Sequence, residues 1–107
     1  MATLLATYGS LAPGRPNHFQ LAGLTGHWFK AIVRGDLVQA GWGAGLGFPG
    51  LMLNPTGGVV EVDVFDAPDL SEHWARLDAF EGEGYRRVLA RMKTTNGTID
   101  AWIYVLA

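Results

Sequence analysis

The feature that most restricts the fold of this chain is a long hairpin pattern near its C-terminal end. Tyr85–Thr94 and Ile99–Leu106 are rich in β-prone residues, and Asn96-Gly97 stands between them. Asn-Gly is the dipeptide most typical of a two-residue hairpin turn, because both central positions of that turn need a positive φ. The pattern therefore predicts two long antiparallel strands, and the rest of the fold must be arranged around them.

Shorter strand patterns precede the hairpin. Thr3–Tyr8, His27–Ala40 and Leu51–Leu53 are apolar and β-prone, and Val59–Phe65 alternates with valine at every second position. Gly35 interrupts the second run, where we expect a bulge. About five to seven strands against one clear helix, without βαβ alternation, argue against a doubly wound sheet. We predict a mostly antiparallel sheet curled into a small barrel, with the helix packed on it.

Length and composition restrict the class of protein. The chain has 107 residues, 49% apolar and 17% charged, which suits a single domain over residues 1–107. Net charge is −2 without a basic block, so we expect no nucleic-acid partner. There is no cysteine, which excludes disulfides and thiol chemistry. No apolar run reaches the roughly 18 residues of a membrane span, and the N-terminal segment lacks the charged start of a signal peptide, so we expect a cytoplasmic protein without a membrane partner.

The clear helix lies within Asp69–Arg87. Asp69 and Glu72 match a capping box at its start, which predicts Asp69 as the N-cap residue. Gly82 is suited to end the helix with a positive φ. The pattern therefore predicts a short helix that stops abruptly at Gly82.

A carboxylate, Glu81, lies on the core-facing side of this helix. At about 100° per residue it falls within an arc of about 60° that holds the apolar residues Leu70, Trp74 and Leu77. Two explanations remain open. Glu81 either pairs with Arg86 or Arg87 as a structural carboxylate, or lies in apolar surroundings that raise its pKa and suit it to proton transfer near neutral pH.

The turn after the first strand is a second candidate site. Consecutive backbone N–H groups over Gly9-Ser10-Leu11 could form a concavity that binds an anion or a carbonyl oxygen. An ordinary turn explains the spacing at least as well.

Two other patterns favour no specific chemistry. Gly41–Gly50 contains a G-x-G-x-x-G match, but Pro49 interrupts it and no helix pattern follows, so we interpret it as a surface loop or as a lid over a pocket. The histidines at 18, 27 and 73 are scattered without a ligand spacing, and we predict no metal site.

Three blocks of the sequence resemble the γ-glutamylcyclotransferase-like family. The blocks are Tyr8-Gly9-Ser10-Leu11-x-x-Gly14-x-x-Asn17-His18, then Leu77-Asp78-x-Phe80-Glu81-Gly82-x-x-Tyr85-Arg86-Arg87, and the weaker Ala101-Trp102-Ile103-Tyr104-Val105. The first two are specific in combination, and together the three cover nearly the whole chain. The resemblance implies an α+β fold, a small mixed but mostly antiparallel β-barrel with one or two short helices packed on it.

The same resemblance implies an activity and a site. The α-amine of a γ-glutamyl substrate would attack its own γ-carbonyl, releasing 5-oxoproline and an amine or amino acid without a cofactor. The residues implied to receive the γ-glutamyl group are Tyr8, Gly9, Ser10 and Leu11, with Tyr85 as a pocket wall. Glu81 is implied as the general acid/base.

Two alternatives to this leading hypothesis stay open. A non-catalytic module could hold a γ-glutamyl metabolite or another small carboxylate in the same pocket, and an ion pair from Glu81 to Arg86 or Arg87 would favour it. A structural interaction domain could instead use Trp42 and Phe48 as contact residues.

Overall fold

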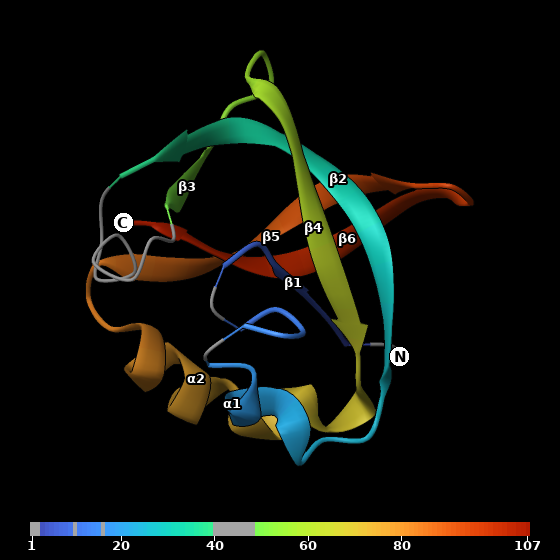
Figure 1. The fold of residues 1–107 in the computed structure, drawn as a ribbon, viewed down its shortest axis with the longest axis vertical. Helices are drawn as coiled ribbons and strands as arrows, with labels where there is room; N and C mark the ends of the chain where they lie inside the picture. Colours follow the sequence, from blue (N-terminus) through green and yellow to red (C-terminus); the bar gives the residue numbers. More distant parts are fainter. Residues whose placement is uncertain (1–2, 10, 16, 40–48) are drawn as a thin grey trace.

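The computed structural model describes residues 3–9, 11–15, 17–39 and 49–107, and its centre is a closed five-stranded mixed β-barrel with an extra strand and two short helices (Figure 1). This architecture confirms the predicted fold class. In chain order the elements are β1 Leu4–Thr7, α1 Phe19–Ala22, β2 His27–Val38, β3 Gly50–Leu53, β4 Gly58–Asp66, the 3₁₀ helix η2 Pro68–His73, α2 Trp74–Glu81, β5 Tyr85–Thr94 and β6 Gly97–Leu106.

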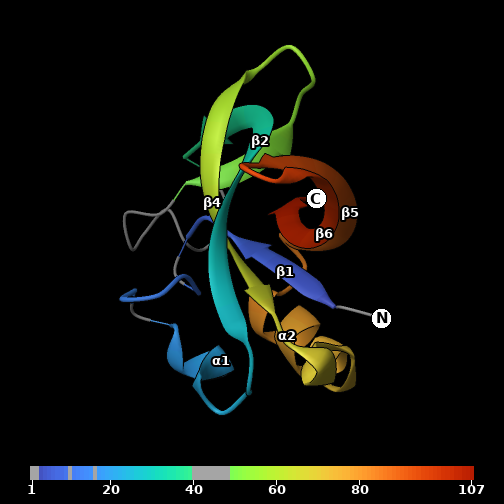
Figure 2. The same ribbon diagram turned by 90° about the vertical axis from the view of Figure 1, so that its right-hand side faces the viewer.

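The strands follow the order β3-β2-β4-β1-β6-β5, and a pairing between β2 and β5 at Ile32 and Lys93 closes the barrel. β1 pairs antiparallel with β4 and parallel with β6, which makes the sheet mixed. Both helices lie at one end of the barrel, opposite the turn between β3 and β4 (Figure 2). The barrel therefore has a helix-covered end and an uncovered end.

The predicted hairpin is confirmed. β5 and β6 pair antiparallel from Tyr85 and Leu106 to Thr94 and Gly97. Gly97 has a φ of +127°, a conformation that a side chain would strain, and the Thr94 hydroxyl accepts a 3.1 Å hydrogen bond from the Asn96 amide. Because Thr94 pairs with Gly97, the two turn residues are Thr95 and Asn96, so the turn lies one residue earlier than the Asn96-Gly97 pattern predicts, and only Gly97 has a positive φ there.

The bulge expected at Gly35 is wrong. β2 runs without interruption through Gly35, which pairs with Leu53 on β3 and with Gly58 on β4. A Cβ at position 35 would lie 2.6 Å from the backbone oxygen of Met52 and 2.7 Å from the Leu51 side chain. Glycine is needed there because β3 approaches β2 closely, and not because the strand bends.

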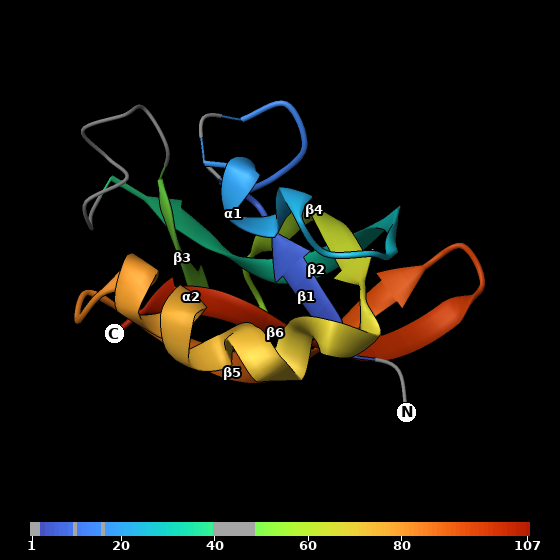
Figure 3. The same cartoon turned by 90° about the horizontal axis from the view of Figure 1, so that it is seen from below.

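Two apolar clusters hold the molecule together. One fills the barrel and includes the alternating valines Val60, Val62 and Val64 of β4, as their spacing predicts. The other packs the helices against the barrel through Leu5, Leu21, Phe65, Leu70 and Leu77. Figure 3 shows α2 crossing the hairpin of β5 and β6, and α2 contacts β5. Burial of this second cluster fixes where α2 ends relative to the strands.

The helix begins differently from its prediction and ends as predicted. The capping box is wrong: Ala67 precedes η2 as its N-cap, and no side-chain cap hydrogen bond forms there or at the start of α2. Pro68 starts a 3₁₀ turn that takes Asp69 into the helix, so Asp69 cannot serve as the extended N-cap. Gly82 ends α2 with a φ of +80° and donates its amide to Asp78 O at 3.0 Å. Within the described ranges, no helix has the length and apolar character needed to cross a membrane.

Candidate functional site

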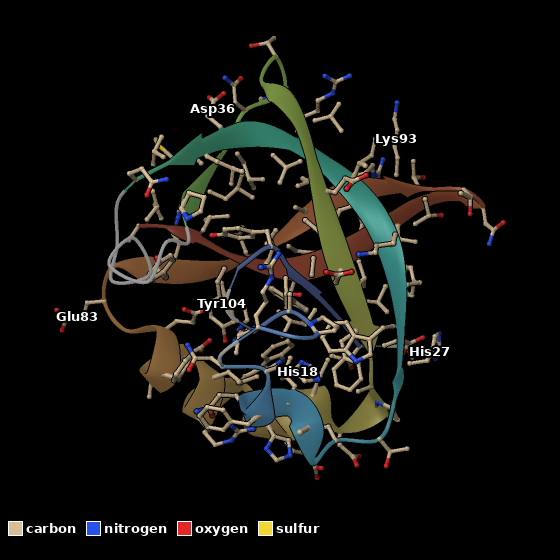
Figure 4. All side chains as sticks on the ribbon, in the orientation of Figure 1. His18, His27, Asp36, Glu83, Lys93 and Tyr104 are labelled. Carbon is tan, nitrogen blue, oxygen red and sulfur yellow. The ribbon has the colours of Figure 1, made fainter. Side chains whose placement is uncertain are left out.

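Glu81 is the last residue of α2 and lies on its inner side, as the periodicity predicts. Leu77, about one turn earlier on α2, is fully buried, as is Leu70 in the preceding η2, and Glu81 itself is half-buried. Burial raises the pKa of the Glu81 carboxyl from 4.5 to about 7. Glu83, two residues on, is exposed, and Figure 4 shows it outside the turn that follows α2. The two neighbouring carboxylates therefore differ in environment, because Glu81 is half-buried and Glu83 is exposed.

Asp78, one turn before Glu81, engages Arg87 of β5. Arg87 Nε donates to Asp78 Oδ1 at 3.0 Å, and a second guanidinium N–H donates to Oδ2 at 3.3 Å. The guanidinium holds the pKa of the Asp78 carboxyl below its usual range. Of the two arginines that the structural explanation considered as partners for Glu81, Arg87 is thus engaged by Asp78.

Aromatic side chains complete this contact between α2 and the hairpin. The Arg87 guanidinium lies 4.3 Å from the ring centre of Trp74 and 4.7 Å from that of Trp102. The two tryptophans meet edge to face at 6.2 Å. Cation–π contacts of this kind favour one fixed position of the guanidinium. These contacts therefore hold α2, which ends at Glu81, against β5 and β6.

Tyr104 connects this cluster to the barrel. Its hydroxyl donates to Asp78 Oδ1 at 2.7 Å, and its backbone oxygen accepts a 2.7 Å hydrogen bond from the Tyr8 hydroxyl. Burial raises the pKa of the Tyr104 hydroxyl, and the charges of Asp78 and Glu81 raise it further. Figure 4 shows Tyr104 between the barrel strands and the helices. Tyr104 thus lies within electrostatic range of Glu81.

Tyr8, at the end of β1, is also part of this region. Its hydroxyl accepts a 3.0 Å hydrogen bond from the Leu51 amide of β3 while donating to Tyr104. Burial raises its pKa most, with further increases from the charges of Tyr85 and Glu81. Tyr85 and Glu81 therefore lie within electrostatic range of Tyr8, so three of the residues singled out from the sequence share one region of the molecule.

The turn after β1 is described in part. The Gly9 backbone oxygen accepts from the Ala12 amide at 3.1 Å. Leu11 is buried in the cluster beneath the helices, and its backbone oxygen lies 3.1 Å from His18 Nδ1. Ser10 lies outside the described residues. Leu11 thus packs in the second apolar cluster, whereas Tyr8 packs against the cluster inside the barrel, and the role predicted for Ser10 stays a prediction.

The predicted lid is largely outside the described residues, which include neither Trp42 nor Phe48. Its last residue, Gly50, belongs to β3 and is buried, and a Cβ there would lie 2.5 Å from the Leu106 side chain. The loop interpretation is therefore wrong for Gly50, which pairs with Val38 of β2. Among the described residues, no three His, Asp or Glu side chains come together as a group that could hold a metal ion.

The sequence analysis missed the cluster around Arg87, which consists of Asp78, Arg87, Tyr104, Trp74 and Trp102. Asp78, Arg87 and Tyr104 all lie within the blocks that carry the family resemblance, which is the one signal that could have singled them out. Their pairing depends on how α2 packs on β5 and β6, and no local spacing encodes it.

Comparisons with known proteins agree with this fold. Residues 5–107 match the family described as gamma-glutamyl cyclotransferase, AIG2-like. No sequence among the curated proteins matches. Of solved structures, YkqA from Bacillus subtilis is similar over 99% of this chain, at 30% identity and a TM-score of 0.76. The chain spans only 36% of YkqA.

Two further solved structures share the fold at lower identity. An AIG2-like protein from Mus musculus is similar over 99% of this chain and 78% of its own, at 20% identity and a TM-score of 0.75. The protein c4763 of uropathogenic E. coli is similar over 100% of this chain and 80% of its own, at 22% identity and a TM-score of 0.69.

Proposed function

The chain belongs to the gamma-glutamyl cyclotransferase, AIG2-like family, and we propose that it catalyses γ-glutamyl cyclotransfer with Glu81 as the general acid/base. The substrate's α-nitrogen forms a bond to its own γ-carbonyl carbon, and the bond from that carbon to the leaving nitrogen breaks. The products are 5-oxoproline and a free amine or amino acid. The α-nitrogen loses two protons as it changes from an ammonium group to the lactam N–H, and the leaving nitrogen gains two as it departs as an ammonium group, so the step balances without a cofactor.

The observation that carries this proposal is the half-buried Glu81 with a pKa of about 7. An α-ammonium group has a pKa of about 8, so its proton passes to such a carboxylate at a cost of about 1 kcal/mol. A carboxylate with the ordinary value of 4.5 would make the same transfer about 3 kcal/mol less favourable. The environment of Glu81 therefore suits it both to take the proton and to return it to the leaving nitrogen.

The remaining parts of the proposed site come from the family resemblance. We assign the γ-glutamyl group to the segment from Tyr8 to Leu11, with Ser10 included, and a wall of the pocket to Tyr85. Backbone N–H groups of this segment would stabilise the oxyanion that forms at the γ-carbonyl. Since the attack is intramolecular, holding the substrate in a curled conformation supplies much of the rate enhancement.

The test is release of 5-oxoproline from a panel of γ-glutamyl amines and γ-glutamyl amino acids. We expect the wild-type protein to turn over at least one compound and Glu81→Gln to lower kcat by roughly 100-fold or more. Glu83→Gln is the matched control, because Glu83 is exposed beyond the helix end, and its rate should equal that of the wild type.

Equal rates for the wild type and Glu81→Gln would remove Glu81 from the mechanism. Saturable binding of a γ-glutamyl compound without turnover of any would instead identify a binding module.

A further inference from the structure

A cavity of about 550 Å³ is lined by strand and turn residues of the barrel, and its described lining includes no residue of the candidate site. Its walls come from β2, from the end of β3 and the turn after it, and from β5 and β6. β2 and β5 pair at Ile32 and Lys93, where the barrel closes, and the cavity lies beside that closure. Along β5, Ala90 in the cavity wall is separated from Tyr85 by roughly 16 Å, at about 3.3 Å per residue.

Positive charge is concentrated at this cavity. Arg34, Arg91 and Lys93 line it, although the whole chain carries only 8 Lys and Arg against 10 Asp and Glu. The described lining residues include no carboxylate. Arg91 pairs with Asp100 outside the lining at 3.3 Å, but both side chains are at least half exposed, so this pair offsets little of the charge.

Arg34 and Lys93 form no ion pair with a described carboxylate. Arg34 donates to the backbone oxygen of Gly57 at 3.3 Å, which leaves its charge unpaired within the described residues. Lys93 has no ion-pair partner among the described side chains, and Figure 4 shows it extending outward beside β2. Two carboxylates adjoin the lining from outside, since Asp36 accepts a 3.0 Å hydrogen bond from Asn54 and Glu61 pairs across from Ile32 on β4. The charged side chains of the described lining itself are all cations, and this is the feature that favours an anion inside the cavity.

The walls between these cations are largely apolar. Ile32, Leu53, Pro55 and Ala90 contribute, and Leu53 is 40% exposed despite its size. Ligand cavities of about 300–1,000 Å³ typically combine apolar walls with a few charged groups that fix the orientation of the ligand. A concave space of this size accommodates one small molecule and is too small for a folded partner or a lipid surface.

We propose that this cavity is a second ligand site that binds one small organic anion, with its acidic group at Arg34, Arg91 and Lys93 and its apolar body against Ile32, Leu53 and Pro55. The inference does not depend on the cyclotransfer activity, because the two sites are formed by different residues. The ligand class is an organic phosphate or carboxylate with a short hydrocarbon portion.

The test uses three probes that separate charge from apolar contact: hexyl phosphate, inorganic phosphate and 1-hexanol. Binding is followed by chemical-shift changes of backbone amides in the ¹⁵N-labelled protein. We expect hexyl phosphate to shift amides of residues 32–34 and 90–93 saturably, with at least 10-fold higher affinity than either other probe. Glu81→Gln should leave this binding unchanged, which separates the cavity from the candidate active site.

Variants decide whether the positions of the cations matter. Arg34→Gln combined with Lys93→Gln should weaken hexyl phosphate binding at least 5-fold, in keeping with loss of two partly exposed charge contacts. The matched control is Arg86→Gln, since Arg86 is exposed on β5 outside the cavity and its change should have less than a 2-fold effect.

Three results would overturn the proposal. They are equal binding of 1-hexanol and hexyl phosphate, a loss in Arg86→Gln that matches the double variant, and no saturable shift up to about 10 mM probe.

Discussion

At the scale of the residue, the pH dependence of turnover should report the environment of Glu81. Its carboxylate form is the base, and burial raises its pKa to about 7, so the base is lost as the pH falls through 7. We expect kcat/KM to decline tenfold per pH unit below about pH 7, measured as initial rates of 5-oxoproline release between pH 5 and 9. A decline that begins near 4.5 would mean that Glu81 is not the titrating base.

The same raised pKa predicts a change in stability that does not depend on activity. Because the folded-state pKa of Glu81 lies above its unfolded value, the folded protein holds the proton more tightly, and stability falls as the pH rises from 4.5 through 7. Glu81→Gln removes this penalty, so it should raise the free energy of unfolding at pH 8 by on the order of 1–2 kcal/mol and change it little at pH 4.5. Urea unfolding at both pH values measures the difference, and equal effects at both would contradict the burial.

How far a single residue can be predicted from the sequence depends on whether its surroundings are local. The inward position of Glu81 follows from spacing within α2, and the existence of a hairpin follows from the local Asn96-Gly97 pattern, although its two turn residues are Thr95 and Asn96. Position 35 needs glycine because the Met52 backbone of another strand lies too close for a side chain. The spacing of residues along β2 could not reveal this contact. The role of Ser10 rests on the family resemblance alone.

At the scale of the element, Arg87 holds α2 against the hairpin. Arg87→Ala removes a bidentate pair with Asp78 and two stacking contacts, so we expect a loss of about 2–3 kcal/mol in the free energy of unfolding. Arg87→Lys keeps the charge but not the planar group, and should recover less than half of that loss. Arg86→Ala, on the exposed neighbour, is the matched control and should stay within about 0.5 kcal/mol of the wild type.

Urea unfolding again supplies the measurement. If Arg87→Ala and Arg86→Ala lower stability equally, the cluster around Arg87 does not fasten α2. The sequence could place Arg87 on a strand and Asp78 on a helix, but their contact arises only when the second apolar cluster packs those two elements together.

At the scale of the whole molecule, the candidate site lies where the chain joins distant segments. β1 lies between β4 and β6 in the barrel. Tyr8, which follows β1, forms hydrogen bonds to β3 and to β6. The strand patterns predicted the elements and the class of fold, yet neither the parallel pairing of β1 with β6 nor the closure of β2 on β5 has a local signature. Tyr8, Glu81 and Tyr85 therefore come into one region only when the barrel closes.

The Tyr8 hydroxyl should be the most costly single hydrogen-bonding group to remove from this junction. Tyr8→Phe leaves the Tyr104 carbonyl and the Leu51 amide without this partner in a largely buried place, and we expect a loss of about 2–4 kcal/mol in the free energy of unfolding. Tyr104→Phe is the matched control: it deletes one hydroxyl whose acceptor, Asp78, keeps its pair with Arg87, so it should cost about 1 kcal/mol. Amide hydrogen exchange adds a local measure, because the Leu51 amide should lose protection in Tyr8→Phe and keep it in Tyr104→Phe. Unchanged exchange at Leu51 in both variants would show that the hydroxyl of Tyr8 does not join β3 to the barrel.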